Sequence, residues 1–344
     1  MESGKNLSRI NVAVLMGGRS EEREVSLSTG RMIMAAIDRD KYNAFAVDSG
    51  RFGMLPPVGS KDIVESTDDT IEDGAVDLFP MECLTRNGSS VDVAFIALHG
   101  RFGEDGTVQG MLELLGIPYV GSGVLASALA MDKIMARKVF ERDGIPLPKA
   151  VVLGAQASNS GSAQEIEREL GLPVVVKPNH QGSSIGLSIA GTHEELVDAL
   201  NLAFQYDDEL LIEQFIKGVE ISCPVLGNRK LQALPVIEIV PAGGIYDYHA
   251  KYTPGATQEI VPARIPEKQY KQAQELAVAC HNSLGCKGMS RTDMIVRGEE
   301  LFVLETNTIP GMTPTSLLPR AAQAAGIEFP ELLDRLIGYA LEER

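Results

Sequence analysis

The sequence predicts a protein of the mixed α/β and α+β class, organised as three units of which the first is built on a parallel sheet. Three observations support this prediction. The 344 residues exceed one ordinary domain of ~100–200 residues. The 44% hydrophobic content is sufficient for several packed cores. Strand and helix patterns alternate early in the chain, whereas long strand patterns follow one another later.

The first unit, residues 1–132, is predicted as an α/β domain. Its first strand is the apolar run "RINVAVLMGG", whose two final glycines indicate a buried parallel strand entering a tight turn. Helical periodicity follows in "REVSLSTGRMIMAAID", then a second buried strand in "VDVAFIAL", then a helix and short strand in "GTVQGMLELLGIPYVG". The segment between, residues 55–90, is rich in Pro, Gly and Asp and is expected to be a loose connection.

A long helix and a proline-rich linker lead into the second unit, residues 133–217. The stretch "VLASALAMDKIMARKVFERDG" is predicted as one helix that ends at Gly144. Beyond Pro146 and Pro148, short helices and strands alternate, which indicates a small α+β unit. Its strands include "PVVVK" and "ELLIEQFI".

The third unit, residues 218–344, is predicted as long antiparallel strands with helices. The expected strands are "GVEISCPVLGN", "LQALPVIEIVPAGGIYDYHAKY", "GMSRTDMIVRG" and "LFVLETN". The expected helices are "KQYKQAQELAVACHNSLG" and "FPELLDRLIGYALEE". These strands and helices would form the third of the three predicted units.

Charge and cysteine content restrict the function classes. The net charge of -16 argues against a nucleic-acid-binding surface. No apolar run approaches the ~20 residues of a membrane span. The four cysteines form no CxxC pair, so buried free thiols in a reducing compartment are expected. A cytoplasmic protein that binds neither nucleic acid nor membrane follows.

The stretch "VLETNTIPGMT" predicts a cation site at a strand end. Glu305 and Asn307 are two residues apart, so both side chains project from the same face of the strand. Two hard oxygen donors together suit a cation such as Mg²⁺. The alternative is a polar strand end at which the asparagine caps the following turn.

A second strand adds a carboxylate and a cation to this prediction. Asp293 lies mid-strand between apolar residues, where a carboxylate is expected to be paired or bound to metal. Arg291 lies two residues earlier and therefore on the same face. A cation beside carboxylates and metal suggests stabilisation of developing negative charge.

A glycine-rich loop between two strand patterns predicts a phosphate-binding hairpin. In "PVVVKPNHQGSSIGLSIA", small residues from Gly182 to Gly186 allow backbone N–H groups to approach phosphates closely. Lys177 supplies a point charge. The alternative is an ordinary hairpin with a surface lysine. The loop lacks the Walker order GxxxxGK[ST], and "GGRSEER" lacks the GxGxxG spacing of dinucleotide folds.

The stretch "LLIEQFIKGVE" is a candidate nucleotide edge. Apolar residues flank Glu213, and backbone groups of such a strand could pair with an adenine rim. Glu220, seven residues on, could accept hydrogen bonds from ribose hydroxyls. The alternative for each is an ordinary solvated glutamate.

In this order, the motifs resemble those of the ATP-grasp superfamily and closely those of the D-alanine–D-alanine ligases. The resemblance runs from about residue 11 to 335 through the blocks "GGRSEEREVSLSTG", "ALHGRFGEDGTVQGMLELLGIPYVGSG", "MDK", "VVKPNHQGSSIG", "LIEQFIKGVEIS", "YDYHAKYTPGATQ", "GCKGMSRTD" and "ETNTIPGMTPTSLLP". It implies a three-domain ATP-grasp fold. It also implies a cytoplasmic enzyme of peptidoglycan precursor synthesis, commonly a homodimer, that joins two D-alanines with ATP and two Mg²⁺ ions, with Mn²⁺ as a possible substitute.

The same resemblance implies a role for individual residues in nucleotide and metal binding. The expected ATP ligands are Lys133 and Lys177 for the phosphates, Lys251 for the γ-phosphate, Glu213 with the backbone of Gln214, Phe215 and Ile216 for adenine, and Glu220 for ribose. The expected metal ligands are Asp293, Glu305 and Asn307.

The resemblance also implies substrate-binding and catalytic roles. Glu22 would hold the ammonium of the first D-alanine, and His99 would line the pocket of the second. Arg291 and the N–H of Gly311 would form the oxyanion site. The remaining expected residues are Ser316 and Leu317 for the carboxylate of the second D-alanine, and Ser183 and Tyr252 for the link between the glycine-rich loop and the mobile loop "KYTPGATQ".

Departures from the family pattern leave rival functions open. Ile309, Pro314 and Thr315 stand where related ligases often have Ser, Ser and His, beside the second-substrate pocket, and Gln214 replaces a frequent lysine. A D-Ala–D-Ser or D-Ala–D-Lac ligase on the same fold is therefore the nearest alternative, although Tyr252 favours the dipeptide. A nucleotide-binding relative without catalysis is a further alternative, which the intact metal and oxyanion set disfavours.

Overall fold

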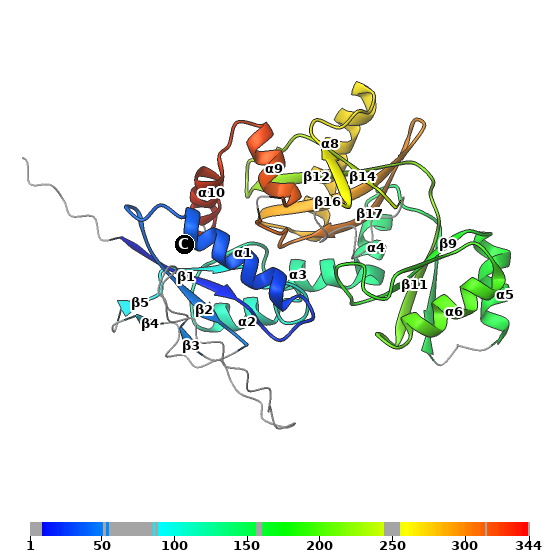
Figure 1. The fold of residues 1–344 in the computed structure, drawn as a ribbon, viewed down its shortest axis with the longest axis horizontal. Helices are drawn as coiled ribbons and strands as arrows, with labels where there is room; N and C mark the ends of the chain where they lie inside the picture. The colour runs from blue at the N-terminus through cyan, green and yellow to red at the C-terminus, as the bar shows by residue number, and fades with distance from the viewer. Residues whose placement is uncertain are drawn as a thin grey trace, which may run out of the picture.

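The computed structural model describes residues 9–50, 53–54, 85–86, 89–155, 160–243, 255–313 and 315–342. Most of the predicted connection at residues 55–90 lies outside these ranges. The same is true of Lys251, Tyr252 and Pro314. The described chain forms three units, with the second unit at the end farthest from the N-terminal sheet (Figure 1).

A mainly parallel sheet forms the first unit, as predicted. Its strand order is β3-β2-β1-β6-β7, in which β1 runs parallel to both neighbours and β3 is antiparallel to β2. The strands are β1 (Ile10–Met16), β2 (Tyr42–Asp48), β3 (Gly53–Met54), β6 (Val93–Ile96) and β7 (Tyr119–Val120), and the helices are α1 (Arg23–Ala36) and α2 (Thr107–Leu114). A separate short hairpin joins β4 (Thr85–Arg86) to β5 (Ser89–Ser90). The central place of β1 explains its continuous apolar run, because both of its faces are covered.

The predicted single helix at residues 124–144 is wrong, because the structure has two helices. They are α3 (Val124–Met131) and α4 (Lys133–Arg142). Asp132 between them has extended backbone, and its side chain accepts a hydrogen bond of 2.9 Å from the N–H of Met135. An aspartate that caps a new helix start ends the preceding one at the same point.

The second unit is an antiparallel sheet covered by two helices. The strand order is β10-β9-β11-β8. The elements are β8 (Ala150–Gly154), β9 (Val174–Pro178), β10 (Ser188–Ala190), β11 (Glu209–Gln214), α5 (Ser160–Leu170) and α6 (His193–Ala203). As predicted, β9 and β10 form a hairpin around the glycine-rich loop.

The third unit is an antiparallel sheet of order β15-β14-β12-β16-β17, with β13 paired to β12. The elements are β12 (Val219–Gly227), β13 (Gln232–Ala233), β14 (Ile237–Pro241), β15 (Thr257–Ile260), β16 (Gly288–Arg297), β17 (Glu300–Asn307) and α8 (Glu267–Leu284). Over residues 231–243, the described part of the long strand predicted from residue 231, the structure has two strands instead of one. Pro235 separates them, because it has no N–H for a sheet, and the N–H of Val236 donates to the Tyr270 hydroxyl (2.9 Å).

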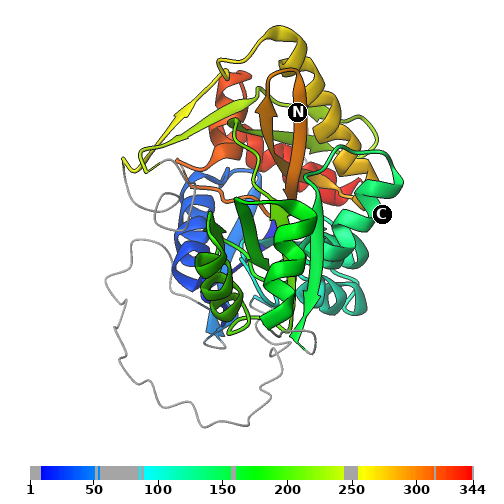
Figure 2. The same cartoon turned by 90° about the vertical axis from the view of Figure 1, so that its right-hand side faces the viewer.

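The C-terminal helices return to the first unit. They are α9 (Leu317–Ala324), which was not predicted, and α10 (Phe329–Leu341). Val14 and Ile96 of the N-terminal sheet belong to the same buried core as Leu333 and Ile337 of α10. Figure 2 shows the red C-terminal helices against the blue N-terminal unit. The beginning and end of the described chain therefore form one core.

Candidate active site

A cavity of about 630 Å³ lies where the three units meet. Its walls come from the start of α1, the loop after β6, the glycine-rich loop, the ends of β15, β16 and β17, and the loop before α9. The structure thus brings together ten of the predicted site residues: Glu22, His99, Lys133, Ser183, Arg291, Glu305, Asn307, Gly311, Ser316 and Leu317.

The polar ends of β16 and β17 lie side by side, as predicted. Asp293 pairs with Glu305 and Arg291 pairs with Asn307 across the two strands. Arg291 donates two hydrogen bonds to Asp293, from Nε to Oδ1 (3.0 Å) and from Nη2 to Oδ2 (2.8 Å). Ser222 on β12 donates a third, of 2.5 Å, to Asp293 Oδ1. The carboxylate in mid-strand is therefore paired, which its burial requires.

Glu305 and Asn307 line the cavity and offer the hard oxygen donors that Mg²⁺ prefers, whereas Asp293 is not among the lining residues. No group of three or more His, Cys, Asp or Glu suited to a metal is found within the described residues. Mg²⁺ usually takes one or two carboxylates and completes its shell with phosphate and water oxygens. Asn307 Oδ1 also accepts the N–H of Ile309 (2.8 Å), so the predicted turn cap is present as well.

The glycine-rich loop closes onto the start of α1. The hydroxyl of Ser183 donates to Glu22, and a Cβ at Gly182 would stand 2.9 Å from Glu22 Oε2. Ser183 and Ser184 have positive φ values of 49° and 61°, which few residues other than glycine adopt easily. The loop and the N-terminal unit thus meet at one carboxylate, a contact that the sequence did not predict.

The two lysines predicted for phosphates have different surroundings. Lys133 lines the cavity and donates from Nζ to the carbonyl of Gln181 (2.5 Å) in the glycine-rich loop. Lys177 is buried and donates from Nζ to Glu213 Oε2 (2.6 Å). Burial alone would lower the pKa of Lys177, but the neighbouring carboxylates, above all Glu213, raise it. Lys177 is therefore a charged, paired group rather than the surface lysine of the alternative.

The predicted adenine edge is partly occupied by sheet hydrogen bonds. The N–H of Gln214 donates to the carbonyl of Lys149 (2.8 Å), and that of Phe215 donates to the carbonyl of Pro173 (3.1 Å). These two N–H groups already have partners, so a backbone contact to adenine from residues 214–216 would have to use their carbonyls or the N–H of Ile216. Glu213 lines a small hollow that shares Lys133 and Glu305 with the main cavity. The other predicted members, Ile216 and Glu220, line neither cavity.

The predicted second-substrate side contains a neutral histidine and a helix start. His99 is buried, its Nε2 lies 3.1 Å from Thr29 Oγ1, and burial lowers its pKa to about 4. Ser316 precedes the first residue of α9, and its Oγ accepts the N–H of Thr313 (3.1 Å). A Cβ at Gly311 would stand 2.8 Å from Ser316 Oγ, so glycine lets this hydroxyl approach the turn closely.

Sequence reasoning missed three carboxyl groups of the cavity, those of Glu24, Glu104 and Glu259. Glu104 accepts the N–H of Gly100 (2.6 Å) at Oε2, and Glu259 is held by the guanidinium of Arg320. Burial, and next the charge of Glu22, raise the pKa of Glu104 to about 8. The signal for Glu104 was its place five residues after His99 in "HGRFGEDG". No local pattern marked Glu259, because its partner lies on a distant helix.

Comparison with known proteins supports the resemblance over nearly the whole chain. Family models described as D-ala D-ala ligase N-terminus and C-terminus match residues 11–122 and 139–338. A D-alanine–D-alanine ligase of Pelotomaculum thermopropionicum is 47% identical over 97% of both chains, and one of Syntrophobacter fumaroxidans is 48% identical over 97% of this chain and 99% of its own.

Solved structures agree with the sequence relatives. The ATP complex of the Bacillus anthracis D-alanine–D-alanine ligase has a TM-score of 0.76 at 35% identity and covers 97% of each chain. The VanG D-Ala:D-Ser ligase of Enterococcus faecalis has a TM-score of 0.80 at 34% identity, covering 97% of this chain and 100% of its own. The predicted ATP-grasp architecture is thereby confirmed, and this chain belongs to the D-alanine–D-alanine ligase family.

Proposed function

We propose that this protein joins two D-alanines to D-alanyl-D-alanine with ATP, through an acyl phosphate, for peptidoglycan precursor synthesis. The observation that carries the proposal is the single cavity that gathers Glu22, Arg291, Glu305 and Gly311 from distant parts of the chain. The family membership and the ATP-bound relative support the use of ATP.

Glu22 and the glycine-rich loop serve the first half of the reaction. The Glu22 carboxylate holds the ammonium of the donor D-alanine, while Ser183 fixes the orientation of that carboxylate. The donor carboxylate attacks the γ-phosphorus of ATP, which yields the acyl phosphate and ADP. Lys133 on the cavity wall, with Lys177 and Lys251, carries positive charge toward the phosphates.

Asp293, Glu305 and Asn307 would hold Mg²⁺, two ions in our proposal, with Mn²⁺ as a possible substitute. The ions would neutralise phosphate charge as the phosphoryl group is transferred. The adenine would lie near Glu213 and the segment from Gln214 to Ile216, with ribose at Glu220.

Arg291 and Gly311 serve the second half. The acceptor amine attacks the carbonyl carbon of the acyl phosphate, and negative charge develops on the carbonyl oxygen. Arg291 is fixed by its two bonds to Asp293, so its charge is oriented before the reaction begins. The start of α9, at Ser316 and Leu317, binds the acceptor carboxylate, and His99 lines the acceptor pocket.

A cytoplasmic homodimer is part of the proposal. It accords with the finding that none of the described helices has the length and apolarity for a membrane span. The three described cysteines, Cys223, Cys280 and Cys286, are free and buried, as a reducing compartment allows.

Product analysis tests the proposed function. Purified protein with ATP, Mg²⁺ and D-alanine should release ADP and form D-alanyl-D-alanine. Parallel mixtures that also contain D-serine or D-lactate decide the acceptor, since Ile309 and Thr315 depart from the usual pattern beside that pocket. A mixed product dominated by D-Ala–D-Ser would replace the proposed acceptor, and ADP release independent of D-alanine would contradict the ligase itself.

A further inference from the structure

Three carboxyl groups of the cavity, those of Glu24, Glu104 and Glu259, have no part in the mechanism above. Glu104 lies in the loop between β6 and α2 and lines the same wall as His99. The N–H of Gly100 holds its Oε2 at 2.6 Å. A Cβ at Gly100 would stand 2.7 Å from Glu22 Oε2, so this short loop places Glu104 close to the carboxylate that receives the donor ammonium.

The reaction requires a group to accept a proton at this place. An amino acid carries an ammonium near neutral pH, and an ammonium has no electron pair with which to attack a carbonyl carbon. The acceptor must therefore lose one proton inside the cavity before the carbon–nitrogen bond can form. The proton acceptor must line the cavity near Arg291 and Gly311, where the oxyanion develops.

The basic and histidine side chains of the cavity are poor proton acceptors. Lys133 and Arg291 are cations. His99 is buried against Thr29, and its lowered pKa of about 4 means that the imidazole holds a proton weakly.

The other carboxylates of the cavity have partners or lie at its edge. Glu22 is bound by Ser183 and would receive the donor ammonium, and Glu305 belongs to the proposed metal site. The Glu259 carboxylate is held by the guanidinium of Arg320, and Glu24 is exposed on α1. Elimination leaves Glu104.

We propose that Glu104 binds the ammonium of the acceptor D-alanine and takes its proton. The proposal rests on the proposed function. One N–H bond of the ammonium breaks, its electron pair stays on nitrogen, and the proton goes to the Glu104 carboxylate. The neutral amine then forms a bond to the carbonyl carbon, the bond from that carbon to the phosphate oxygen breaks, and phosphate leaves. The nitrogen then loses one of its two remaining protons to phosphate or water, which leaves the neutral amide.

The charges around Glu104 link this step to donor binding. Glu22 and Glu305 oppose its ionisation, Arg291 favours it, and His99 beside it is neutral. In the empty site the Glu104 pKa is high, so the carboxyl retains its proton. Burial is the main cause of the raised Glu104 pKa, and the charge of Glu22 is the next. A donor ammonium at Glu22 offsets that charge, which lowers the Glu104 pKa and favours ionisation of the group when an acceptor must bind.

The test replaces Glu104 and varies the acceptor. Glu104→Gln keeps an oxygen that can accept the Gly100 N–H, so the loop should stay in place. With D-alanine alone, dipeptide formation should fall by roughly 10²–10⁴-fold, as for loss of a general base. Hydroxylamine is a neutral amine near pH 7, so with it as acceptor the variant should form D-alanyl hydroxamate at nearly the wild-type rate. The matched control is Glu113→Gln, an exposed change on α2, which should behave as wild type with both acceptors.

Each outcome decides the proposal. A Glu104→Gln enzyme with wild-type dipeptide formation overturns it, and so does equal loss with both acceptors, since that indicates a structural or phosphoryl-transfer role. If thermal melting shows that Glu104→Gln does not fold, Glu104→Asp is measured instead. Its side chain is one methylene shorter, so its carboxyl lies farther from the acceptor. We again expect slower dipeptide formation and nearly wild-type hydroxamate formation. Failure of the wild-type protein to make any dipeptide would instead refute the proposed function.

Discussion

Lys177 and Glu213 show how far single residues can be predicted from sequence. Each was assigned to ATP, one to phosphate and one to adenine, yet the structure joins them in an ion pair with side chains only 10% and 4% exposed. Arg137 is a second cation, 3.4 Å from Glu213. Local sequence patterns identify charged residues within apolar strands. They do not show which residues face each other on adjacent strands, because that depends on the register of the two strands.

Removal of one partner of this pair should destabilise the protein. Lys177→Met leaves Glu213 buried with only the more distant Arg137, so the free energy of unfolding should fall by about 3 kcal/mol, and the KM for ATP should rise. The double variant Lys177→Met/Glu213→Leu should recover most of the stability but not the affinity for ATP. Urea unfolding and ATP kinetics measure both. Lys268→Met, in an exposed pair with Glu299, is the control and should change stability by less than about 0.5 kcal/mol.

The ion pair of Arg23 and Asp48 should make the stability of the protein depend on pH in the acid range. Burial opposes ionisation of Asp48, but hydrogen bonds from Arg23 and from the N–H of Gly50 outweigh it and hold its pKa below the usual range. A depressed pKa contributes stability that is fully present above the unfolded value of ~3.9 and is lost as pH falls through the folded value. Asp48→Asn should therefore be less stable near neutral pH, and its melting temperature should converge with wild type in strong acid. Parallel melting curves at every pH would refute this.

The strand-end carboxylates should separate metal binding from stability. Glu305→Gln should retain the fold and lose nearly all ATP turnover at ordinary Mg²⁺, with partial recovery at raised Mg²⁺. Asp293→Asn should lose turnover as well and also lose stability, because Arg291 loses a charged partner with which it shares two hydrogen bonds. Magnesium titrations and thermal melting distinguish the two. Wild-type turnover in either variant would contradict the metal assignment.

At the scale of elements, helices and strands with long periodic patterns were predicted correctly. A boundary set by a single residue, such as the break between two helices, was not. The strand β16 and the helix α8 fall where expected, since each has an extended pattern of its own. The division between α3 and α4 was missed because apolar periodicity continues across Asp132. The strand β2 was also missed, although six of its seven residues are buried, because it is recognisable mainly by its pairing with β1.

Asp132 should matter to two elements at once. Its Oδ1 caps α4 at Met135 and also accepts a 2.9 Å hydrogen bond from Nδ2 of Asn179, which begins the glycine-rich loop. Asp132→Ala should lower the free energy of unfolding by about 1–2 kcal/mol and raise the KM for ATP. Chemical denaturation and ATP kinetics measure the two effects. Glu194→Ala, an exposed change on α6, should alter neither, and an equal effect in both variants would exclude a specific role for Asp132.

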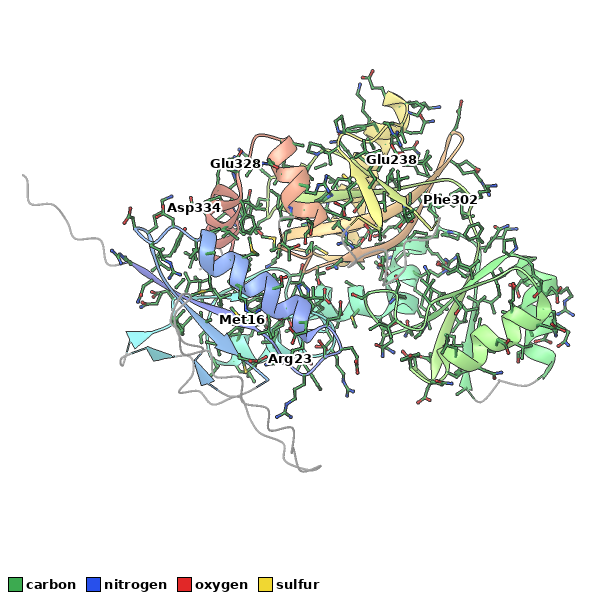
Figure 3. All side chains as sticks on the ribbon, in the orientation of Figure 1. Met16, Arg23, Glu238, Phe302, Glu328 and Asp334 are labelled. Atoms are coloured by element: carbon green, nitrogen blue, oxygen red, sulfur yellow. The ribbon has the colours of Figure 1, made fainter. Side chains whose placement is uncertain are left out.

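At the scale of the whole molecule, α10 unites the ends of the chain. Besides the shared core, the Tyr42 hydroxyl donates to Asp334 Oδ1 (2.6 Å) and Lys41 Nζ donates to Oδ2 (3.0 Å). Figure 3 labels Asp334 on this helix beside the N-terminal unit. Sequence periodicity predicted the helix but not the face against which it packs, because contacts between distant segments leave no local pattern.

A core substitution in α10 should loosen the N-terminal sheet. Leu336 is fully buried, so Leu336→Ala should lower the free energy of unfolding by about 2–5 kcal/mol. Hydrogen exchange should accelerate in β1 and β6 as well as in α10. Leu114→Ala, on a side chain that is 92% exposed, is the control. Faster exchange confined to α10 would show that the two ends do not act as one cooperative unit.

The return of α10 also has a consequence for biosynthesis. The strands β6 and β7 leave the ribosome early, but α10, which packs against them, is made only when residues 329–341 are translated. At ~5–20 residues per second, that interval lasts on the order of tens of seconds. During it, apolar side chains such as Val14 and Ile96 lack their final partners and are available to chaperones or to neighbouring nascent chains. A ribosome stalled before residue 329 should therefore hold a protein whose first-made sheet is the part most prone to aggregate.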